Sequence, residues 1–348
     1  MQASRRRFTL IDGLRGLAAV SVMLYHYCTS DMRVHLAALL PAWFMAATKK
    51  GWLGVQVFFV LSGFVIAYAI GRREMDLPSG ARFALRRQVR LDPPYWVSLL
   101  FSSALPWGWR LHLHDNRWAP SLRDVGFHLV YLQDLFHRRP IQPIYWTLAI
   151  EVQFYMVFVA CLVALRRLPR AGPYALLASG LYALHAAMHW RFLGGWFIPH
   201  WYMFVLGVLT WWRLDKRFHW LPHALYVALI AYMGYRFHRL EPYAAAGVAT
   251  LITVAGLTDR LHRWLDLRVL QFLGAISYGI YLLHPVTGAQ TRWVLGGIFS
   301  RGRTPDGALG VVICSCLATV GCAWLLHVAV EKPAMALAAR IKWDRTRA

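Results

Sequence analysis

Charged residues are scarce in this sequence. They make up only 16% of its 348 residues, whereas a soluble globular protein carries about 25%. Hydrophobic residues account for 58%, and apolar runs of membrane-spanning length recur along the whole chain. The composition therefore excludes an ordinary soluble domain and predicts an all-α, polytopic transmembrane helical bundle.

Acidic residues are the rarer charged class, since 16 Asp and Glu stand against 38 Lys and Arg and give a net charge of +22. No basic segment stands apart from the apolar runs, so nucleic acid is not an expected partner. Lys and Arg gather instead in the cytoplasmic loops of membrane proteins. Cysteine is also scarce, and all five cysteines lie in apolar runs, which argues against a disulfide framework.

The sequence also lacks internal repeats, low-complexity segments and a cleavable signal peptide. The basic residues 1–9 precede an apolar run that no small-residue cleavage site follows, so this run is expected to be a signal anchor. We divide the chain into a basic cytoplasmic N-terminal tail over 1–9, a membrane domain over 10–331 and a basic cytoplasmic C-terminal tail over 332–348.

Ten apolar segments are candidates to cross the bilayer core of about 30 Å. They fall at roughly 10–30, 51–71, 91–109, 144–165, 172–190, 194–212, 219–235, 242–257, 268–290 and 307–330. With both termini inside, the inner segments hold 23 Lys and Arg and the outer segments hold 14. This excess predicts that both termini are cytoplasmic. The amphipathic stretch 124–136 of the longest outer loop is expected either to lie on the outer surface or to plug the site.

The first segment carries an arginine and a histidine that a spanning helix tolerates at a cost. A charge at the centre of such a helix costs about 2.5–3.5 kcal/mol. Arg15 and His26 are eleven residues apart, so on a helix they differ by roughly 20° in azimuth and about 16 Å in height. They share one face, which predicts a path for a substrate across the membrane. The alternative is a snorkelling arginine and a core histidine.

A cluster of arginines meets the predicted membrane surface after the second span. Arg86, Arg87 and Arg90 precede Pro93 and Pro94, and proline in a first helical turn loses no hydrogen bond, so the next helix is expected to start there. The arginines either anchor the topology or clamp phosphate, because guanidinium groups bind phosphate oxygens in a bidentate way. Coenzyme A, with its several phosphates, is the ligand that the second interpretation favours.

Polar residues inside other spans are further candidates. Thr147 and Glu151 are four residues apart on the fourth span and share a face. Glu151 lies about two turns into the membrane and needs a partner. His26 is the expected partner, because a carboxylate that bonds an imidazole fixes its tautomer and raises its basicity. Ser62 and Gly63 form a notch in the second span that permits close backbone approach.

Two candidate residues near the ends of the last two spans could have a structural role instead of a functional one. His284 is placed near the outer surface, either as a structural residue or as the next candidate base after His26. Glu331 is placed near the cytoplasmic face and is interpreted as a helix-end contact. Two histidine pairs have the spacing of metal ligands, His112/His114 and His185/His189. No third ligand accompanies either pair, so no metal site is expected.

Taken in order, these segments resemble the motifs of the acyltransferase-3 family of bacterial integral-membrane O-acyltransferases. The family's arginine, ten residues and histidine are matched within "IDGLRGLAAVSVMLYH", and its Ser-Gly-Phe motif by "FFVLSGF". Its later motifs are matched by Arg86, Arg87, Arg90 and Pro93, by Trp146, Thr147, Leu148 and Glu151, and by "SYGIYLLHP" and "EKP". The resemblance covers essentially residues 8–335. Gln56 departs from it where an acidic residue is common, and Thr147 stands where serine is usual.

The resemblance implies an enzyme of the bacterial cytoplasmic (inner) membrane. It would move an acyl group, expected to be acetyl, from cytoplasmic acyl-CoA to a hydroxyl of a cell-surface glycan, a lipid-linked sugar or a similar small acceptor. Acyl-CoA is a co-substrate, and no permanently bound cofactor is expected. The alternative function is a polytopic transporter of an acidic solute or protons, because intramembrane Arg, His and Glu also mark transport pathways.

The resemblance also implies roles for particular residues. His26, Glu151 and Arg15 are the catalytic candidates. His26 would act as a general base or carry the acyl group as an acyl-imidazole. The donor- and substrate-binding candidates are Arg86, Arg87, Arg90, Thr147, Ser62, Tyr155 and His284.

Overall fold

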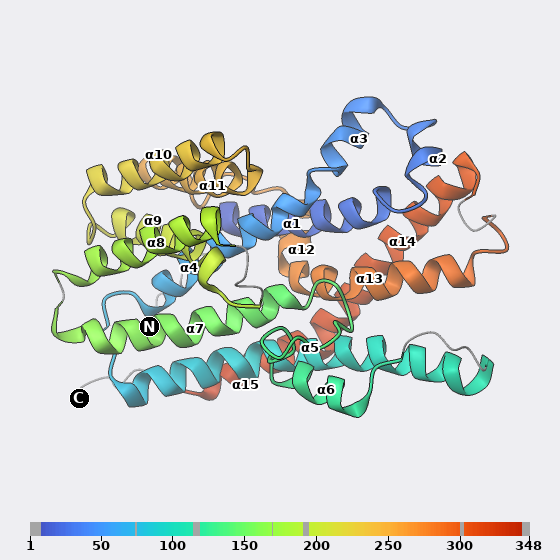
Figure 1. Cartoon of the computed structure of the whole chain (residues 1–348), viewed down its shortest axis with the longest axis horizontal. Coiled ribbons are helices and arrows are strands. Elements are labelled where there is room, and N and C mark those ends of the chain that lie inside the picture. The colour runs from blue at the N-terminus through green and yellow to red at the C-terminus, as the bar shows by residue number, and fades with distance from the viewer. Residues whose placement is uncertain are drawn as a thin grey trace.

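The protein is a bundle of helices that run mostly along one axis (Figure 1). The computed structural model describes residues 8–73, 75–113, 119–168, 170–190, 195–299 and 303–342. Within these ranges every regular element is helical and no β-strand forms. The all-helical class expected from the composition is therefore confirmed.

The predicted spans correspond to helices. The long helices are α1 (Thr9–Cys28), α4 (Gly54–Ile70), α5 (Leu77–Leu113), α7 (Trp146–Ala164), α8 (Gly172–His189), α9 (Ile198–Leu214), α10 (Trp220–Arg236), α11 (Leu240–Leu257), α13 (Ser277–Val294) and α14 (Pro305–Leu326). The shorter ones are α2 (Arg33–Ala37), α3 (Ala42–Thr48), α6 (Leu122–Leu129), α12 (Arg268–Ala275) and α15 (Lys332–Arg340). Each predicted span overlaps one long helix.

Several stretches of the described residues are long and apolar enough to cross a membrane. These are Ala42–Ile70, Trp146–Arg167, Leu240–Leu257 and Pro305–Arg340. The predicted span 268–290 is broken, because α12 and α13 bend by 71° where they meet; counted as one span, they make a fifth. Other helices are shorter, such as α9 with 17 residues, or carry charges, as α1 does. The number ten therefore stays a prediction.

The expected helix start at Pro93 and Pro94 is wrong. α5 begins at Leu77 and continues through both prolines, which spanning helices tolerate where neighbouring groups satisfy the freed carbonyls. Its 37 residues extend about 55 Å, well beyond the bilayer core of about 30 Å. The basic segment 82–90 is consequently helical, and its arginines project from the same rigid element as the apolar part.

The centre of the bundle depends on a close crossing of α4 and α9. A Cβ atom on Gly63 would overlap the carbonyl oxygen of Phe204, and one on Gly207 would overlap that of Val60. Small residues allow such backbone contact between membrane helices. The close approach predicted at the Ser62-Gly63 notch is therefore confirmed.

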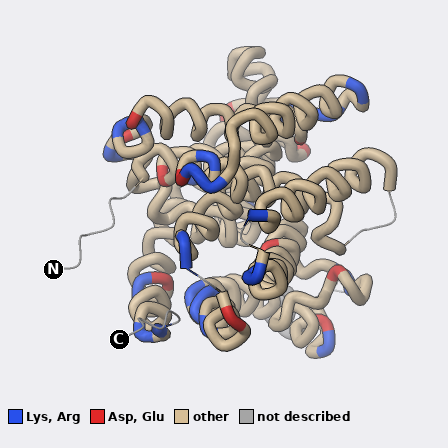
Figure 2. The backbone as a smooth tube through the Cα atoms, turned by 90° about the vertical axis from the view of Figure 1, so that its left-hand side faces the viewer, with Lys and Arg blue, Asp and Glu red and all other residues tan. Residues whose placement is uncertain are grey.

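Two ion pairs each join segments that the charge pattern assigns to the same side of the membrane. Arg72 lies 3.1 Å from Asp215, and both belong to loops assigned to the inner side. Asp31 and Arg292, 2.5 Å apart, belong to segments assigned to the outer side. Figure 2 looks along the bundle from the end where α7 joins α8, and Lys and Arg occur there on several helix ends. The alternation of sides is thus consistent with the contacts between loops.

The amphipathic stretch 124–136 packs against the middle of α5 (Figure 1). α6 starts with a capping box in which Ser121 and Asp124 exchange hydrogen bonds, and Arg138 donates to Asp124 at 2.7 Å. The hydrogen bonds from Ser121 and Arg138 hold the pKa of Asp124 below its ordinary value. Hydrogen bonds from α5 side chains to carbonyls at the end of α6 attach the segment to α5. None of its residues lines the cavity described next, so it covers the bundle rather than plugging the site.

Candidate active site

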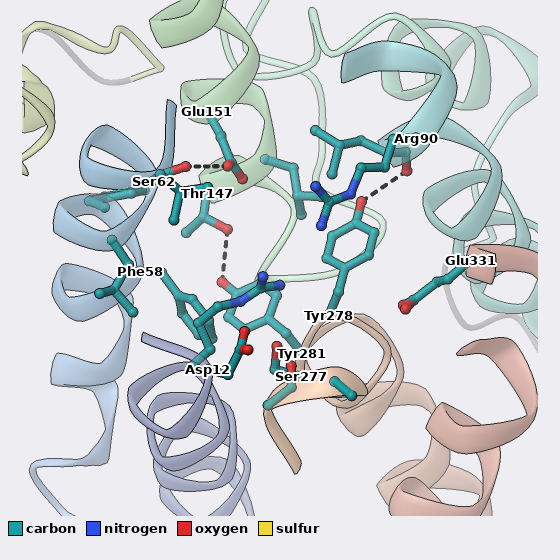
Figure 3. A pocket seen from close by; sticks show the side chains of 18 of the residues that line it. Asp12, Phe58, Ser62, Arg90, Thr147, Glu151, Ser277, Tyr278, Tyr281 and Glu331 are labelled. Carbon is teal, nitrogen blue, oxygen red and sulfur yellow. Dashed lines mark hydrogen bonds between the residues drawn. The ribbon is translucent and has the colours of Figure 1, made fainter. Parts of the chain in front are cut away.

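A cavity of about 410 Å³ lies between α1, α4, α5, α7, α12, α13 and the segment around α15. Its volume is within the range of small-molecule sites. Figure 3 shows side chains from these helices converging on it. The charged residues of its wall are Asp12, Arg15, Arg87, Arg90, Glu151 and Glu331, and the aromatic ones are Phe58, Phe59, Tyr278 and Tyr281. So many ionisable groups at the membrane interior mark a functional site.

Glu151 is the centre of a hydrogen-bonded network. Ser62 donates to its Oε1 at 2.5 Å, and the Tyr155 hydroxyl donates to the same oxygen. Arg87 in turn donates to the Tyr155 hydroxyl at 2.8 Å, and its guanidinium lies 4.5 Å from the centre of the Tyr155 ring. Tyrosine thereby links the carboxylate to a balancing positive charge. The network brings together four of the residues predicted for the site.

The predicted pairing of Glu151 with His26 is not formed. The hydrogen bonds of Glu151 go to Ser62 and Tyr155, and His26 is not part of the cavity wall. Spacing along α1 and α7 defines which face of each helix is polar, but the rotation of one helix against the other decides which groups meet. In this bundle α4, with Ser62, occupies the position beside Glu151 (Figure 3).

Two arginines of the wall form no hydrogen bond through their side chains to any of the described residues. Arg15 and Arg90 both face the cavity, and neither donates a side-chain hydrogen bond to any residue in the described part of the chain. Arg90 also lies within electrostatic range of Arg15, Arg87 and the two carboxylates Glu151 and Glu331. A guanidinium carries five donors and no acceptor, so these two groups present their donors to a ligand that must be an acceptor, and an anion best of all.

Hydroxyl groups complete the wall. Thr147 and Tyr281 share a hydrogen bond of 2.8 Å, and Tyr278 donates to the Leu91 carbonyl at 3.0 Å. The tyrosines are three residues apart on α13, so they share its cavity-facing side. Sequence reasoning did not select either one. The signal was present in "SYGIYLLHP", where two hydroxyl-bearing rings repeat at helical spacing, but tyrosine is too common in spanning helices to stand out.

Glu331 belongs to the cavity, which corrects its interpretation as a helix-end contact. A π-helical turn, His327–Glu331, joins α14 to α15, and such turns occur frequently at functional sites. His327 lies 2.6 Å from one carboxylate oxygen of Glu331. The other oxygen is buried and has no hydrogen-bond partner. Sequence reasoning also missed Asp12, which lies one turn before Arg15 on α1 and lines the same wall.

His26 and His284 are brought together just beyond this wall. Their ring centres are 5.0 Å apart, although 258 positions separate them in the sequence. Tyr281 lines the cavity, and His284 follows it by one turn of α13. His284 is fully buried within the bundle, and its predicted depth near the outer surface stays a prediction. His26 is half-buried.

The remaining candidates lie elsewhere. Arg86 is on α5 but does not line the cavity. His185 and His189 stack with ring centres 4.2 Å apart on α8, while His114 lies outside the described residues. In the part of the chain that the structure describes, no group of three His, Cys, Asp or Glu is placed to hold a metal ion.

Comparisons with known proteins identify the family. A family model described as an acyltransferase domain matches residues 8–328. A Komagataeibacter xylinus protein named as a membrane-bound transacylase, BcsY, is 28% identical over 304 residues, covering 79% of this chain and 71% of that protein. Acyltransferase MdmB of Streptomyces mycarofaciens is 26% identical over 379 residues, covering 96% and 93%.

A third relative matches over a shorter region. Peptidoglycan O-acetyltransferase OatA of Listeria monocytogenes is 28% identical over 173 residues, which cover 46% of this chain and 25% of that protein. No solved structure gives a significant match. The family model spans most of the chain and confirms the resemblance inferred from the motifs. The chain therefore belongs to the acyltransferase-3 family and is a membrane acyltransferase.

Proposed function

We propose that this acyltransferase moves an acyl group, expected to be acetyl, from cytoplasmic acyl-CoA to a hydroxyl of a glycan, a lipid-linked sugar or a similar small acceptor. It would do so as a multi-pass protein of the bacterial inner membrane, with about ten spans and both termini in the cytoplasm. The observation that carries the proposal is the pair Arg15 and Arg90, two guanidiniums that face one cavity and donate no hydrogen bond to any described residue.

The donor would bind through its phosphates. Charge-assisted hydrogen bonds from guanidinium to phosphate oxygen are short and strong, and Arg90 supplies free donors for them. Arg87 is already engaged by Tyr155, so it would add positive charge rather than the main contact. Arg15 lies on the same face of α1 as His26. The pantetheine arm would run past Arg15 and carry the thioester toward the histidines.

The chemistry would centre on His26 acting as a general base. The acceptor hydroxyl gives its proton to His26 while its oxygen attacks the thioester carbonyl carbon. The tetrahedral intermediate then collapses, the carbon–sulfur bond breaks, and the imidazolium returns the proton to the departing thiolate. The products are the acylated acceptor and free coenzyme A. Alternatively, His26 attacks the thioester itself, so that the carbon–sulfur bond breaks and the coenzyme A thiolate leaves an acyl-imidazole. The acceptor hydroxyl then attacks this acyl group, the carbon–nitrogen bond breaks, and the proton of the hydroxyl passes to the thiolate.

The wall near the histidines would stabilise the oxyanion. Thr147 and Tyr281 carry hydroxyls that already share a hydrogen bond beside the cavity, and one of them can turn to donate to the developing negative charge. Losing one such donor typically costs about 2.7–4 kcal/mol of transition-state stabilisation. As for the acceptor, OatA is named a peptidoglycan O-acetyltransferase, which supports a glycan hydroxyl within the proposed class.

Label transfer tests the proposal. Envelope fractions from cells that make the wild-type chain, His26→Ala or no chain are incubated with acetyl-CoA labelled in the acetyl group, and esters in the glycan and lipid fractions are identified by mass spectrometry. General-base catalysis contributes roughly 100- to 10,000-fold, so His26→Ala should reduce labelling at least 100-fold. Tyr25→Phe, which alters the residue next to His26, is the matched control and should retain labelling.

Two results would overturn the proposal. Near-normal labelling by folded His26→Ala would place the chemistry elsewhere. Movement of protons or an acidic solute across vesicles that contain the protein, with no ester formed, would favour the transporter that the sequence left open.

A further inference from the structure

α13 contains a proline directly after His284. Pro285 has no N–H, so the carbonyl four residues earlier, that of Tyr281, has no donor from its own helix. The structure supplies another donor, because His284 Nδ1 lies 2.8 Å from this oxygen. A second contact of Nδ1, to the Ile280 carbonyl at 3.2 Å, is also with an acceptor. A carbonyl oxygen only accepts, so Nδ1 of His284 carries the proton.

The other ring nitrogen of His284 is therefore a lone-pair acceptor. His284 Nε2 is buried and has no hydrogen-bond partner, and the side chain as a whole is fully buried. A buried acceptor without a partner costs about 1–3 kcal/mol. The nearest ring is that of His26, with centres 5.0 Å apart, while the rings of Tyr281 and Tyr27 are 6.0 and 6.3 Å away.

Hydrogen bonds next to the two histidines fix the position of α1 relative to α13. Tyr27, next to His26 on α1, donates to the His284 carbonyl at 2.6 Å. Its hydroxyl also lies 2.7 Å from Thr319, which lies 2.6 Å from Thr287. α1, α13 and α14 are thereby joined at this level. No carboxylate or guanidinium of the described residues is hydrogen-bonded to either imidazole.

We propose that His284 is the positioning residue for His26. Its Nε2 accepts a hydrogen bond from a ring N–H of His26, so that the other nitrogen of His26 faces the acceptor hydroxyl with its lone pair free. The inference rests on the proposed role of His26 as the base. His284 thus occupies the role that sequence reasoning assigned to Glu151.

The separation of the two rings is compatible with this bond. Two imidazoles joined edge to edge by a nitrogen–nitrogen hydrogen bond of about 3 Å have centres about 5 Å apart, and the observed separation is 5.0 Å. The planes are tilted by 38°, and the bond requires the His26 ring to turn until its N–H points at Nε2 of His284. Pro285 contributes to this arrangement, because it leaves the Tyr281 carbonyl without a helical donor and with both lone pairs available to the Nδ1–H of His284.

Kinetics and NMR together test the inference. His284→Phe keeps the ring but removes the acceptor nitrogen. It should lower kcat by roughly 10- to 100-fold, the range for groups that orient a functional histidine, with KM for acetyl-CoA within twofold. His284→Gln retains an acceptor oxygen and should recover part of the loss. Added to His26→Ala, the His284→Phe change should lower activity no further, because both act in one unit.

The readout on the wild-type protein does not depend on activity. In ¹⁵N-histidine spectra, assigned by comparison with His284→Phe, the His284 ring should show a protonated Nδ1 and an unprotonated Nε2.

Distinct outcomes separate this inference from the proposed function. Unchanged kcat in folded His284→Phe overturns it, as does a wild-type spectrum with the proton on Nε2. If His284→Phe does not fold, the wild-type spectrum decides, assigned by comparison with His284→Gln. Loss of acyl transfer in His26→Ala alongside normal His284→Phe would reject only the positioning role. Retained transfer in His26→Ala would instead reject the role of His26 itself.

Discussion

Replacing Arg90 with alanine tests the proposed donor site. Arg90 lines the cavity and hydrogen-bonds to no described residue, so its removal leaves no protein acceptor without a donor. A measured loss of affinity therefore reports on the ligand alone. A hydrogen bond to a charged group contributes about 1.5–3 kcal/mol, and each 1.4 kcal/mol is about tenfold in affinity. Arg90→Ala should weaken acetyl-CoA binding by roughly 10- to 150-fold.

Neighbouring arginines on α5 provide the controls. Arg86 does not line the cavity, so Arg86→Ala should change the affinity for acetyl-CoA by less than twofold. Arg87→Ala should behave differently from both, because it removes the donor to Tyr155 and disturbs the network around Glu151. It should lower the unfolding temperature as well as the affinity. Arg90→Lys should recover only part of the loss, since a point charge does not reproduce the planar fork.

The assay compares two donors that differ only in phosphate. Binding of acetyl-CoA and of acetyl-pantetheine is measured by calorimetry on protein in lipid nanodiscs. Arg90→Ala should weaken acetyl-CoA binding and leave acetyl-pantetheine binding as in the wild type. The reasoning is refuted if Arg90→Ala binds acetyl-CoA normally, or if both donors lose affinity equally.

Three further changes have defined outcomes. Gly63→Ala drives a methyl group into the α9 backbone and should destabilise the protein by about 1–3 kcal/mol in thermal unfolding, whereas Gly321→Ala, which meets open space, should not; equal effects would contradict the close crossing. Hydrogen bonds from Ser121 and Arg138 depress the pKa of Asp124, so its carboxylate stabilises the fold above the unfolded pKa of about 3.9, and this contribution is lost as the pH falls through the folded pKa. Asp124→Asn should remove that part of the acid dependence of the unfolding temperature, and an unchanged profile would argue against it. A C-terminal alkaline phosphatase fusion should be inactive and a fluorescent-protein fusion bright, while an active phosphatase would reverse the predicted topology.

The functional role of the intramembrane charges was predictable, because placing a charge in the membrane costs free energy and a charge without a function is rarely kept there. Arg15 and Glu151 each stand out in an apolar run, Arg90 belongs to the arginine cluster at the predicted membrane surface, and the structure places all three around one cavity. Helical spacing also predicted correctly that Thr147 shares a side with Glu151. These inferences use only the residues of one helix, where 3.6 residues per turn decides which side chains are neighbours.

Contacts between helices were not predictable in the same way. The partner of Glu151 is Ser62, and choosing it over His26 requires the relative rotation of two helices that no pattern along either one records. The helix start at Pro93 failed for another reason. Proline ends helices in water, but a bundle can satisfy the freed carbonyls with its own groups. The full burial of His284 was likewise not predictable, because depth along a helix says nothing of burial.

The crossing of α4 and α9 has a consequence for how the chain is made. Phe204 is synthesised 141 residues after Gly63, which at typical translation rates is on the order of ten seconds later. Throughout that interval α4 sits in the bilayer without the helix that later touches its backbone. Glu151, the hydrogen-bond partner of Ser62, is likewise synthesised 89 residues after it. Insertion and assembly are thus separate stages of biogenesis, and an agent that engages the exposed glycine face of α4 during the first stage would block the second.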